Sequence, residues 1–327
     1  MNQGDHIPAV QKPTLRTVEA LNIFNLLLLQ LVALIFFQRI PAWPTILVGN
    51  ALVIGLILVL ARESEFNSRP WIVFFRDWLP VPLILYTFKE TYLMVHPINP
   101  VDYDWLLIDL DRWLFGTDPT RWLAQYASPV LTEYLQIIYS TFYVFPLLLI
   151  IFLYRSRRQK DFHFAVFIIA FGFYLSYIGY FLIPALGPRF TLHDFLTLDR
   201  ELPGLAVSKL IRWFINTAEN IPPDALNPAA FAQRDTFPSG HTEITLIVMV
   251  LSTKFRLRSQ WLFYPVGISL IFATVYLRYH YVVDLIAGAI FMIITLAAAP
   301  FIDRWWSRRA TQRGSKEPSP PVAEAVK

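Results

Sequence analysis

The chain has 327 residues, of which 55% are hydrophobic and 16% are charged, and its formal net charge is +4 at pH 7. A mean hydropathy of +0.46 excludes an ordinary soluble globular domain and predicts a membrane protein with several spanning helices. The absence of cysteine excludes disulfides and thiolate metal sites, and the small positive charge gives no indication of nucleic-acid binding.

Eight apolar windows follow one another along the chain, and most approach the roughly 20 residues that a bilayer-spanning helix needs. They cover residues 21–37, 45–60, 79–95, 134–154, 162–183, 241–253, 261–277 and 281–302. The third carries Lys89 and Glu90 near one end, which we interpret as interfacial, and the sixth is short. We therefore predict an all-α polytopic membrane protein with about eight transmembrane helices.

Basic residues predict the orientation of these helices, because Lys and Arg accumulate in short cytoplasmic loops. With the N-terminus inside, 18 of the 28 Lys and Arg residues fall on the cytoplasmic side, including the run RSRRQK at 155–160. Both termini are then cytoplasmic, and the location that we expect is the plasma (inner) membrane. The two long loops, 96–133 and 184–240, lie outside, and the second contains SKLIRWFINTAENI, whose spacing predicts a short interfacial helix.

Polar residues gather where the last spans meet the outer surface. Ser239 is a candidate N-cap before the sixth window, and Gly240 leaves open the helix N–H groups, which can bind an anion such as phosphate. Arg189 offers a planar fork of donors that matches phosphate oxygens. His280 and Asp284 are spaced i, i+4, so the carboxylate can accept from one ring nitrogen and leave the other as a nucleophile or base.

Each of these signals also has a simpler interpretation. A single histidine at an interface, such as His241, is often a solvated cap, and Arg278 by itself is typical of an interfacial anchor. The acidic pairs 102/104 and 109/111 resemble metal-binding pairs, but such pairs are common in solvated loops, and we predict neither a metal nor a cofactor. Asp284 is different, because an ionisable group inside a span is costly and indicates function.

Three short motifs make the chain recognisable. GPR at 187–189, PSGH at 238–241 and HYVVD at 280–284 resemble the signature motifs of the type-2 phosphatidic acid phosphatase superfamily, over residues 162–302. RDWLP and LDRWLFG, which precede this region, resemble the inositol phosphorylceramide synthase-like branch. The resemblance implies a six-helix phosphatase-type core.

The resemblance also assigns roles to individual residues. His280 would attack phosphorus, Asp284 would orient it, and His241 would protonate the leaving oxygen. Arg189, Ser239 and Gly240 would bind phosphate. The family motifs also expect a lysine where this chain has Leu182 and an arginine where it has Thr274, so Arg278 could supply one of the missing charges.

Two functions remain open. The first is a membrane-bound lipid phosphatase or phosphotransferase that cleaves a lipid phosphoester on the extracytoplasmic side through a phosphohistidine. Water or a polyol would accept the group. The second is a transporter or binder of anionic lipid headgroups that does no chemistry. We divide the chain into a cytoplasmic N-terminus (1–17), a transmembrane catalytic domain (18–307, motif core 162–302) and a disordered cytoplasmic tail (308–327).

Overall fold

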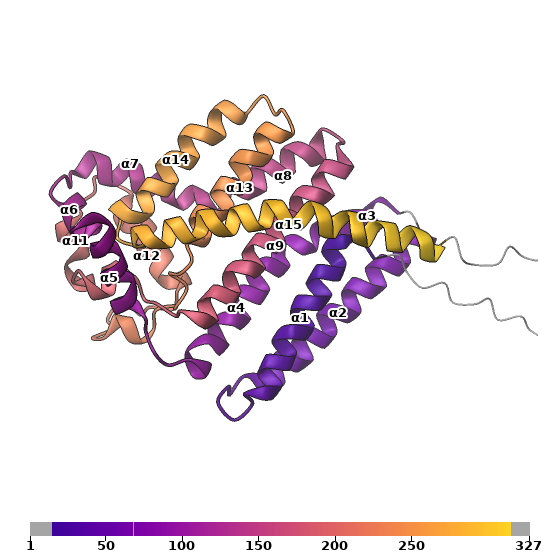
Figure 1. Ribbon diagram of the computed structural model, residues 1–327, viewed down its shortest axis with the longest axis horizontal. Coiled ribbons are helices and arrows are strands. Elements are labelled where there is room, and N and C mark those ends of the chain that lie inside the picture. Colours follow the sequence, from indigo (N-terminus) through magenta and orange to yellow (C-terminus); the bar gives the residue numbers. More distant parts are fainter. Residues whose placement is uncertain (1–14, 68, 315–327) are drawn as a thin grey trace, which may run out of the picture.

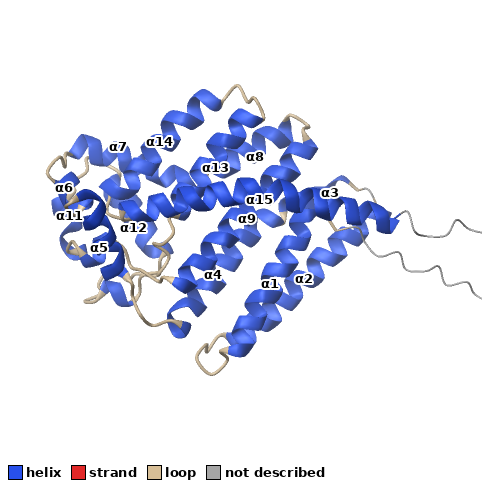
Figure 2. Cartoon of the chain, in the orientation of Figure 1, coloured by secondary structure: helices blue, strands red, loops and turns tan. Residues whose placement is uncertain are grey.

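A computed structural model describes residues 15–67 and 69–314, with side chains up to residue 309. The described part is helical, with no strand, and its helices are joined by short loops except at one end of the molecule (Figure 2). The predicted all-α class is therefore confirmed for these residues. The longer α-helices are α1 (Thr17–Ile35), α2 (Trp43–Phe66), α3 (Pro70–Trp78), α4 (Pro80–Ile98), α5 (Asp104–Phe115), α7 (Pro129–Ser140), α8 (Phe145–Arg155), α9 (Gln159–Leu182), α12 (Ser208–Ala218), α13 (Gly240–Lys254), α14 (Gln260–Tyr276) and α15 (Val282–Gly314).

Short elements fill the connections. They are α6 (Pro119–Ala124), η1 (Thr141–Tyr143), α10 (Pro188–Thr191), η2 (Phe195–Thr197), α11 (Leu198–Glu201) and η3 (Pro228–Ala230). Most of them, together with α5 and α12, form a cap at one end of the bundle, on the left of Figure 1. The two predicted outer loops are therefore largely structured, because their apolar side chains pack onto the ends of the spans.

Helix α9 forms the centre of the bundle. It is apolar on all sides, as expected for a helix surrounded by protein, and it packs against α1, α4, α8, α13 and α15 (Figure 1). The largest core cluster joins its side chains to those of α8 and α13, with Phe162, Leu149 and Ile247 all buried. The resulting core holds the end of α9 and the starts of α13 and α15 close to one another.

Five helical segments of the described chain are long and apolar enough to cross a membrane, or six if a bent pair counts as one. All eight predicted windows lie on helices, but α13 has 15 residues and α14 has 17, which is short for a full span. The window 134–154 is also interrupted, because α7 and α8 meet at a 50° bend. An integral membrane protein is consistent with this structure, whereas the count of eight spans and the six-helix core remain predictions.

The predicted short helix in the second outer loop is confirmed as α12. One side of it is buried, mainly against α7, through Ser208, Arg212 and Ile215. The opposite side exposes large apolar side chains, namely Leu210, Trp213 and Phe214. Such a two-sided helix is typical of an element that lies at a membrane interface.

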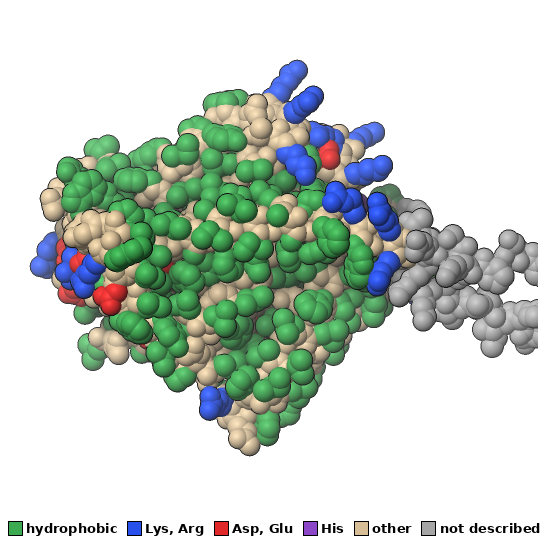
Figure 3. Space-filling view, viewed as in Figure 1, with side chains coloured by type: hydrophobic (Ala, Val, Ile, Leu, Met, Phe, Trp, Pro, Cys, Tyr) green, Lys and Arg blue, Asp and Glu red, His purple; other side chains and the backbone are tan. Residues whose placement is uncertain are grey.

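The two ends of the chain fall mostly outside the described residues. This holds for the predicted cytoplasmic N-terminus, 1–17, of which only residues 15–17 are described, and for residues 315–327 of the predicted tail. Residues 308–314 continue helix α15, so the helical part of the chain extends beyond the boundary expected from composition. Basic side chains gather at this end of the molecule, opposite the cap (Figure 3).

Candidate active site

Three segments that are far apart in the sequence meet under the cap. The backbone N–H of Arg189 donates to the carbonyl of Arg278 at 3.0 Å, and the N–H of Ser239 donates to the carbonyl of Asp284 at 3.0 Å. These bonds join the segment after α9, the start of α13 and the α14–α15 turn. The structure thus brings the three motifs together, as the predicted topology requires.

Gly187 is the point of closest approach between these segments. Its φ of 96° lies in the left-handed region, which only glycine adopts without strain. A Cβ at this position would lie 2.8 Å from the carbonyl oxygen of Tyr279 and 3.1 Å from Oγ1 of Thr236. Glycine is needed here so that the GPR segment can pack against both other motifs.

The start of α13 has the predicted capping geometry. Oγ of Ser239 accepts from the backbone N–H of Thr242 at 3.2 Å, and the helix begins at Gly240. The first N–H groups of a helix have no partner within the helix and carry its partial positive charge. Ser239 and Gly240 therefore stand at an end of α13 that suits an anion.

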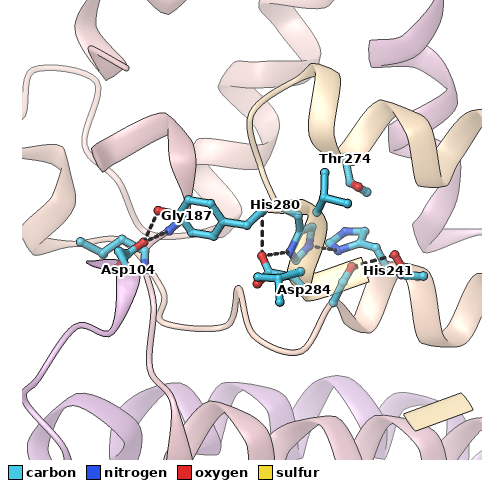
Figure 4. Close-up of polar contacts among 12 residues, drawn as sticks. Asp104, Gly187, His241, Thr274, His280 and Asp284 are labelled. Atoms are coloured by element: carbon cyan, nitrogen blue, oxygen red, sulfur yellow. Dashed lines mark hydrogen bonds and ion pairs between the residues drawn. The ribbon is translucent and has the colours of Figure 1, made fainter. Parts of the chain in front are cut away.

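His241, His280 and Asp284 form a line of polar contacts (Figure 4). Nδ1 of His241 lies 3.2 Å from Nε2 of His280, and Nδ1 of His280 lies 3.4 Å from Oδ2 of Asp284. The same carboxylate oxygen accepts from the N–H of Tyr281 at 2.8 Å, which fixes its position. The arrangement is consistent with a His280 tautomer that has its proton on Nδ1 and a lone pair on Nε2 that faces Nδ1 of His241.

Aromatic rings hold His241 in place. The ring centre of Phe142 lies 4.2 Å from that of the His241 imidazole, and the ring of Tyr139 stacks on the imidazole with 4.9 Å between ring centres. Tyr139 also stacks on Tyr279 at 4.2 Å.

His280 is buried, and this loss of hydration lowers its pKa well below the usual range, with His241 adding to the effect. His280 is therefore neutral at pH 7, as a nucleophile requires.

Arg189 is buried beside the histidines. Its guanidinium carbon lies 4.6 Å from the ring centre of Tyr279 and 4.7 Å from that of Phe190, and Nη2 pairs with the carboxylate of Glu219. The other terminal nitrogen, Nη1, is buried and has no hydrogen-bond partner within residues 15–67 and 69–309. A buried donor without a partner is costly, and in an active site it commonly marks a place for a ligand.

Arg278, the other arginine predicted at the phosphate site, pairs with a different carboxylate. The buried guanidinium of Arg278 pairs with Glu201 from α11, and phosphate binding by Arg278 remains a prediction. Leu182 lies exposed in the last turn of α9. Thr274 contributes through its backbone, because its carbonyl accepts from the N–H groups of Tyr279 at 2.9 Å and His280 at 3.1 Å. The turn that carries His280 is therefore held by a main-chain acceptor.

Two carboxylates of α5, Asp104 and Asp111, support the motif segments. Asp104 accepts from the backbone N–H groups of Leu186 and Gly187 at 2.9 and 2.8 Å and from the hydroxyl of Tyr281 at 2.8 Å. Asp111 accepts from the N–H groups of Val282 and Val283, at the start of α15, at 3.0 and 2.8 Å. Their i, i+7 spacing puts both carboxylates on one helix face. Sequence reasoning that considered only the pairs 102/104 and 109/111 missed this signal.

Replacing Asp111 with asparagine should lower kcat with a smaller effect on KM. An amide oxygen can accept from one of the two N–H groups, but the amide nitrogen cannot accept from the other, so the start of α15 loses a contact worth about 1–3 kcal/mol. We expect kcat to fall roughly tenfold or more. Asp109→Asn is the matched control, because Asp109 is exposed on the same helix. Equal effects of the two substitutions would contradict a positioning role for Asp111.

A cavity of about 360 Å³ leads from His241 into the membrane-spanning part of the protein. It runs between α4 and α8 and along α9 from Tyr180 to Val166, a length of roughly 20 Å at the rise of an α-helix. Leu85 and Tyr143 line it and are also exposed on the outside, so the cavity opens sideways. Residues on both sides of the bend between α7 and α8, among them Tyr139 and Pro146, line this space.

The end of the cavity near His241 is polar. Lys89, Glu219, Gln233 and Asp235 line it, and Nζ of Lys89 donates to the carbonyl of Ala218 at 2.6 Å. Lys89 thus faces the protein interior instead of serving only as an interfacial anchor. Burial, with Glu219 nearby, raises the pKa of Asp235 to about 7. A molecule in this cavity would have an apolar tail in the bundle and a polar end beside the histidines.

A comparison with protein families agrees with this geometry. The model of the PAP2 superfamily matches residues 105–298, which is more than half of the chain. The chain belongs to the PAP2 superfamily. The matched region begins in α5, directly after Asp104, and ends in α15, so it includes His241, His280, Asp284 and the supporting carboxylate of Asp111. Neither a search of curated proteins nor a search of solved structures gave a match.

Membership of the PAP2 superfamily supports a phosphatase-type enzyme with a lipid phosphate substrate in a membrane. The described residues contain no group of three or more His, Cys, Asp and Glu side chains that could hold a metal ion. The side chains that converge here are instead two histidines, one aspartate and one arginine. Side chains of these types can act as nucleophiles, proton donors and anion sites.

Proposed function

We propose that this PAP2-superfamily protein cleaves a phosphoester of a membrane lipid through a phosphohistidine and passes the phosphoryl group to water or to an alcohol, as in the inositol phosphorylceramide synthase-like branch. The observation that carries the proposal is the line His241–His280–Asp284 beside a buried arginine, at the polar end of an apolar cavity. A nucleophile, its orienting carboxylate and an anion site in one place support covalent catalysis.

In the first step Nε2 of His280 forms a bond to phosphorus, and the bond from phosphorus to the leaving oxygen breaks. The negative charge of the bound phosphoryl group would favour the protonated form of His241, and this imidazolium gives its Nδ1 proton to that oxygen and becomes neutral. Nδ1–H of His280 donates to Asp284, which stabilises the positive charge that develops on the ring. In the second step neutral His241 takes a proton from water or an alcohol, whose oxygen displaces His280 from phosphorus.

The phosphoryl oxygens would lie on Arg189 and on the N–H groups at the start of α13, with Ser239 and Gly240 shaping that end of the helix. Electrostatic stabilisation of this kind carries most of the catalysis in phosphoryl transfer. In this structure Nδ1 of His241 contacts Nε2 of His280 directly, so the phosphoryl group must separate the two nitrogens when it binds. Arg278 remains a second candidate for the phosphate site.

The lipid chain would occupy the cavity between α4 and α8 and enter through its sideways opening. Basic side chains at the opposite end of the molecule support an orientation with both termini in the cytoplasm and the site on the extracytoplasmic side of the inner membrane (Figure 3). A transporter or binder of anionic headgroups is the alternative, and it would use the same arginine and cavity. It offers no account of the two adjacent histidines and their aspartate.

Purified protein in detergent should release phosphate from a lipid phosphomonoester and should transfer the phosphoryl group when a polyol is added. We expect radioactive label from the donor to appear first on the protein, in an acid-labile form typical of phosphohistidine, and then in phosphate or in a phosphorylated polyol. Absence of both labelled protein and phosphate release across a panel of lipid phosphates would favour the binding or transport alternative. Phosphate release that no polyol diverts would limit the activity to hydrolysis.

A further inference from the structure

A second cavity, of about 240 Å³, lies beside the last turns of α4. Tyr92 and His96 of α4 line one side of it, and Ala230, from the loop that carries η3, lines the other. His96 and Ala230 are also exposed on the outside, so the cavity opens at the surface. The reaction proposed above leaves this space unused.

The second cavity adjoins the first, which contains His241. The residues that line both cavities are Phe88, Tyr180, Gln233 and Asp235. The hydroxyl oxygen of Tyr180 lies close to the start of α13, because a Cβ at Gly240 would lie 2.8 Å from it. The shared wall therefore stands next to the helix end that is proposed to bind phosphate.

Two polar side chains of this shared wall have hydrogen-bonding capacity left. Gln233 is 5% exposed, and its Nε2 is buried without a hydrogen-bond partner within residues 15–67 and 69–309. The carboxylate of Asp235 accepts no hydrogen bond from another residue of those ranges. Buried polar groups are nearly always paired, so an N–H donor and a carboxylate acceptor on one wall indicate a place for a group that both accepts and donates.

The charges around Asp235 narrow the choice of that group. After burial, Glu219 has the largest effect on the pKa of Asp235, and Arg189 has the next largest. Two carboxylates on the same side of the site repel an anion, so this wall does not suit a second phosphate. A hydroxyl group suits it, because a hydroxyl donates to the carboxylate of Asp235 and accepts from the amide N–H of Gln233.

We propose that Gln233 and Asp235 form a hydroxyl-binding subsite for the alcohol acceptor, and that this subsite selects a polyol over water and over an alcohol with a single hydroxyl. The proposal rests on the proposed function, which supplies the phosphoenzyme. The attacking hydroxyl gives its proton to His241, so the further hydroxyls of the same molecule are the groups that bind Gln233 and Asp235. The second cavity would admit the polyol from the outside.

The test divides one phosphoenzyme among competing acceptors. Glycerol and 1-propanol have the same carbon chain, but glycerol has more hydroxyl groups, and inositol serves as a second polyol. In each transfer the acceptor oxygen forms a bond to phosphorus, the bond from phosphorus to Nε2 of His280 breaks, and His241 takes the proton. With an aryl phosphate as donor, released aryl oxide counts all turnovers and inorganic phosphate counts hydrolysis, so their difference is transfer.

Asp235→Asn removes the charge of the acceptor, and Gln233→Leu removes the donor. Each should lower the ratio of polyol transfer to hydrolysis roughly tenfold, which is the effect of one weakened hydrogen bond to a charged or buried group. The ratio for 1-propanol should stay at the parent value. Neither ratio depends on how much of the protein is active. Asp224→Asn is the matched control, because Asp224 is an exposed carboxylate of the same loop, and both of its ratios should match the parent.

An unchanged polyol ratio in either variant, or an equal fall with 1-propanol, would refute the subsite. If one variant does not accumulate, the other decides. A parent protein that forms no phosphoenzyme would show that both the proposed function and the subsite are wrong. A parent that forms a phosphoenzyme and releases phosphate but transfers to neither polyol would refute the subsite and leave the hydrolase activity in place.

Discussion

Replacing His280 with alanine should abolish turnover of every substrate, whatever its leaving group. In the proposed mechanism the bond to phosphorus forms at Nε2 of His280, and the opposite ring nitrogen of the same residue contacts Asp284. Because burial lowers the pKa of His280, the ring stays neutral as the pH falls through the usual histidine range. In the parent, the rate of phosphoenzyme formation should therefore fall only at pH values below that range, where the ring finally takes up a proton.

The measurement is a pre-steady-state burst with an aryl phosphate in the same detergent for each protein. His193→Ala is a suitable control, because His193 is a histidine of the same outer region whose Nε2 contacts Thr120 at 3.0 Å instead of the catalytic line. We expect the burst to persist in the control. A burst from His280→Ala would mean that another group attacks phosphorus.

Replacing His241 with alanine should have an effect that depends on the leaving group. The proposed role of His241 is to protonate the departing oxygen, and general acid catalysis typically contributes about 10²- to 10⁴-fold. An alkoxide needs that proton, whereas the oxide of an acidic phenol departs without it. We therefore expect a loss of about that size on a lipid phosphomonoester and a much smaller loss in the first step with an aryl phosphate.

With the aryl substrate, phosphoenzyme should accumulate in His241→Ala, because the same residue activates the acceptor in the second step. Burst size and steady-state rate, measured together, separate the two steps. Tyr139→Phe provides the comparison, since it keeps a ring against His241 and removes only a hydroxyl. An equal loss on aryl and alkyl substrates in His241→Ala would assign it a role other than proton transfer.

Local pattern was enough to predict several parts of this protein. Each of the eight apolar windows lies on a helix, since side-chain hydropathy and helix formation depend mainly on neighbours in the sequence. Ser239 as the N-cap of α13 and α12 as a short two-sided helix could be predicted for the same reason. The contact of His280 with Asp284 was expected from a shared helix face; it forms, although His280 lies in the turn before α15, and the matched PAP2 model agrees with the motifs.

Contacts between distant parts of the chain complete the site and its cavity, and only the tertiary structure determines these contacts. Asp104 and Asp111 bind backbone N–H groups more than 80 residues away, and their acidic spacing by itself resembled a metal site or a solvated loop. The pairing of Arg189 with Glu219 joins residues 30 positions apart through the packing of α12 on the cap. The bend between α7 and α8, whose residues line the cavity, occurs within a window whose sequence predicts one continuous apolar helix. Such contacts depend on which surfaces meet in space, and hydropathy and short-range spacing carry no information about that.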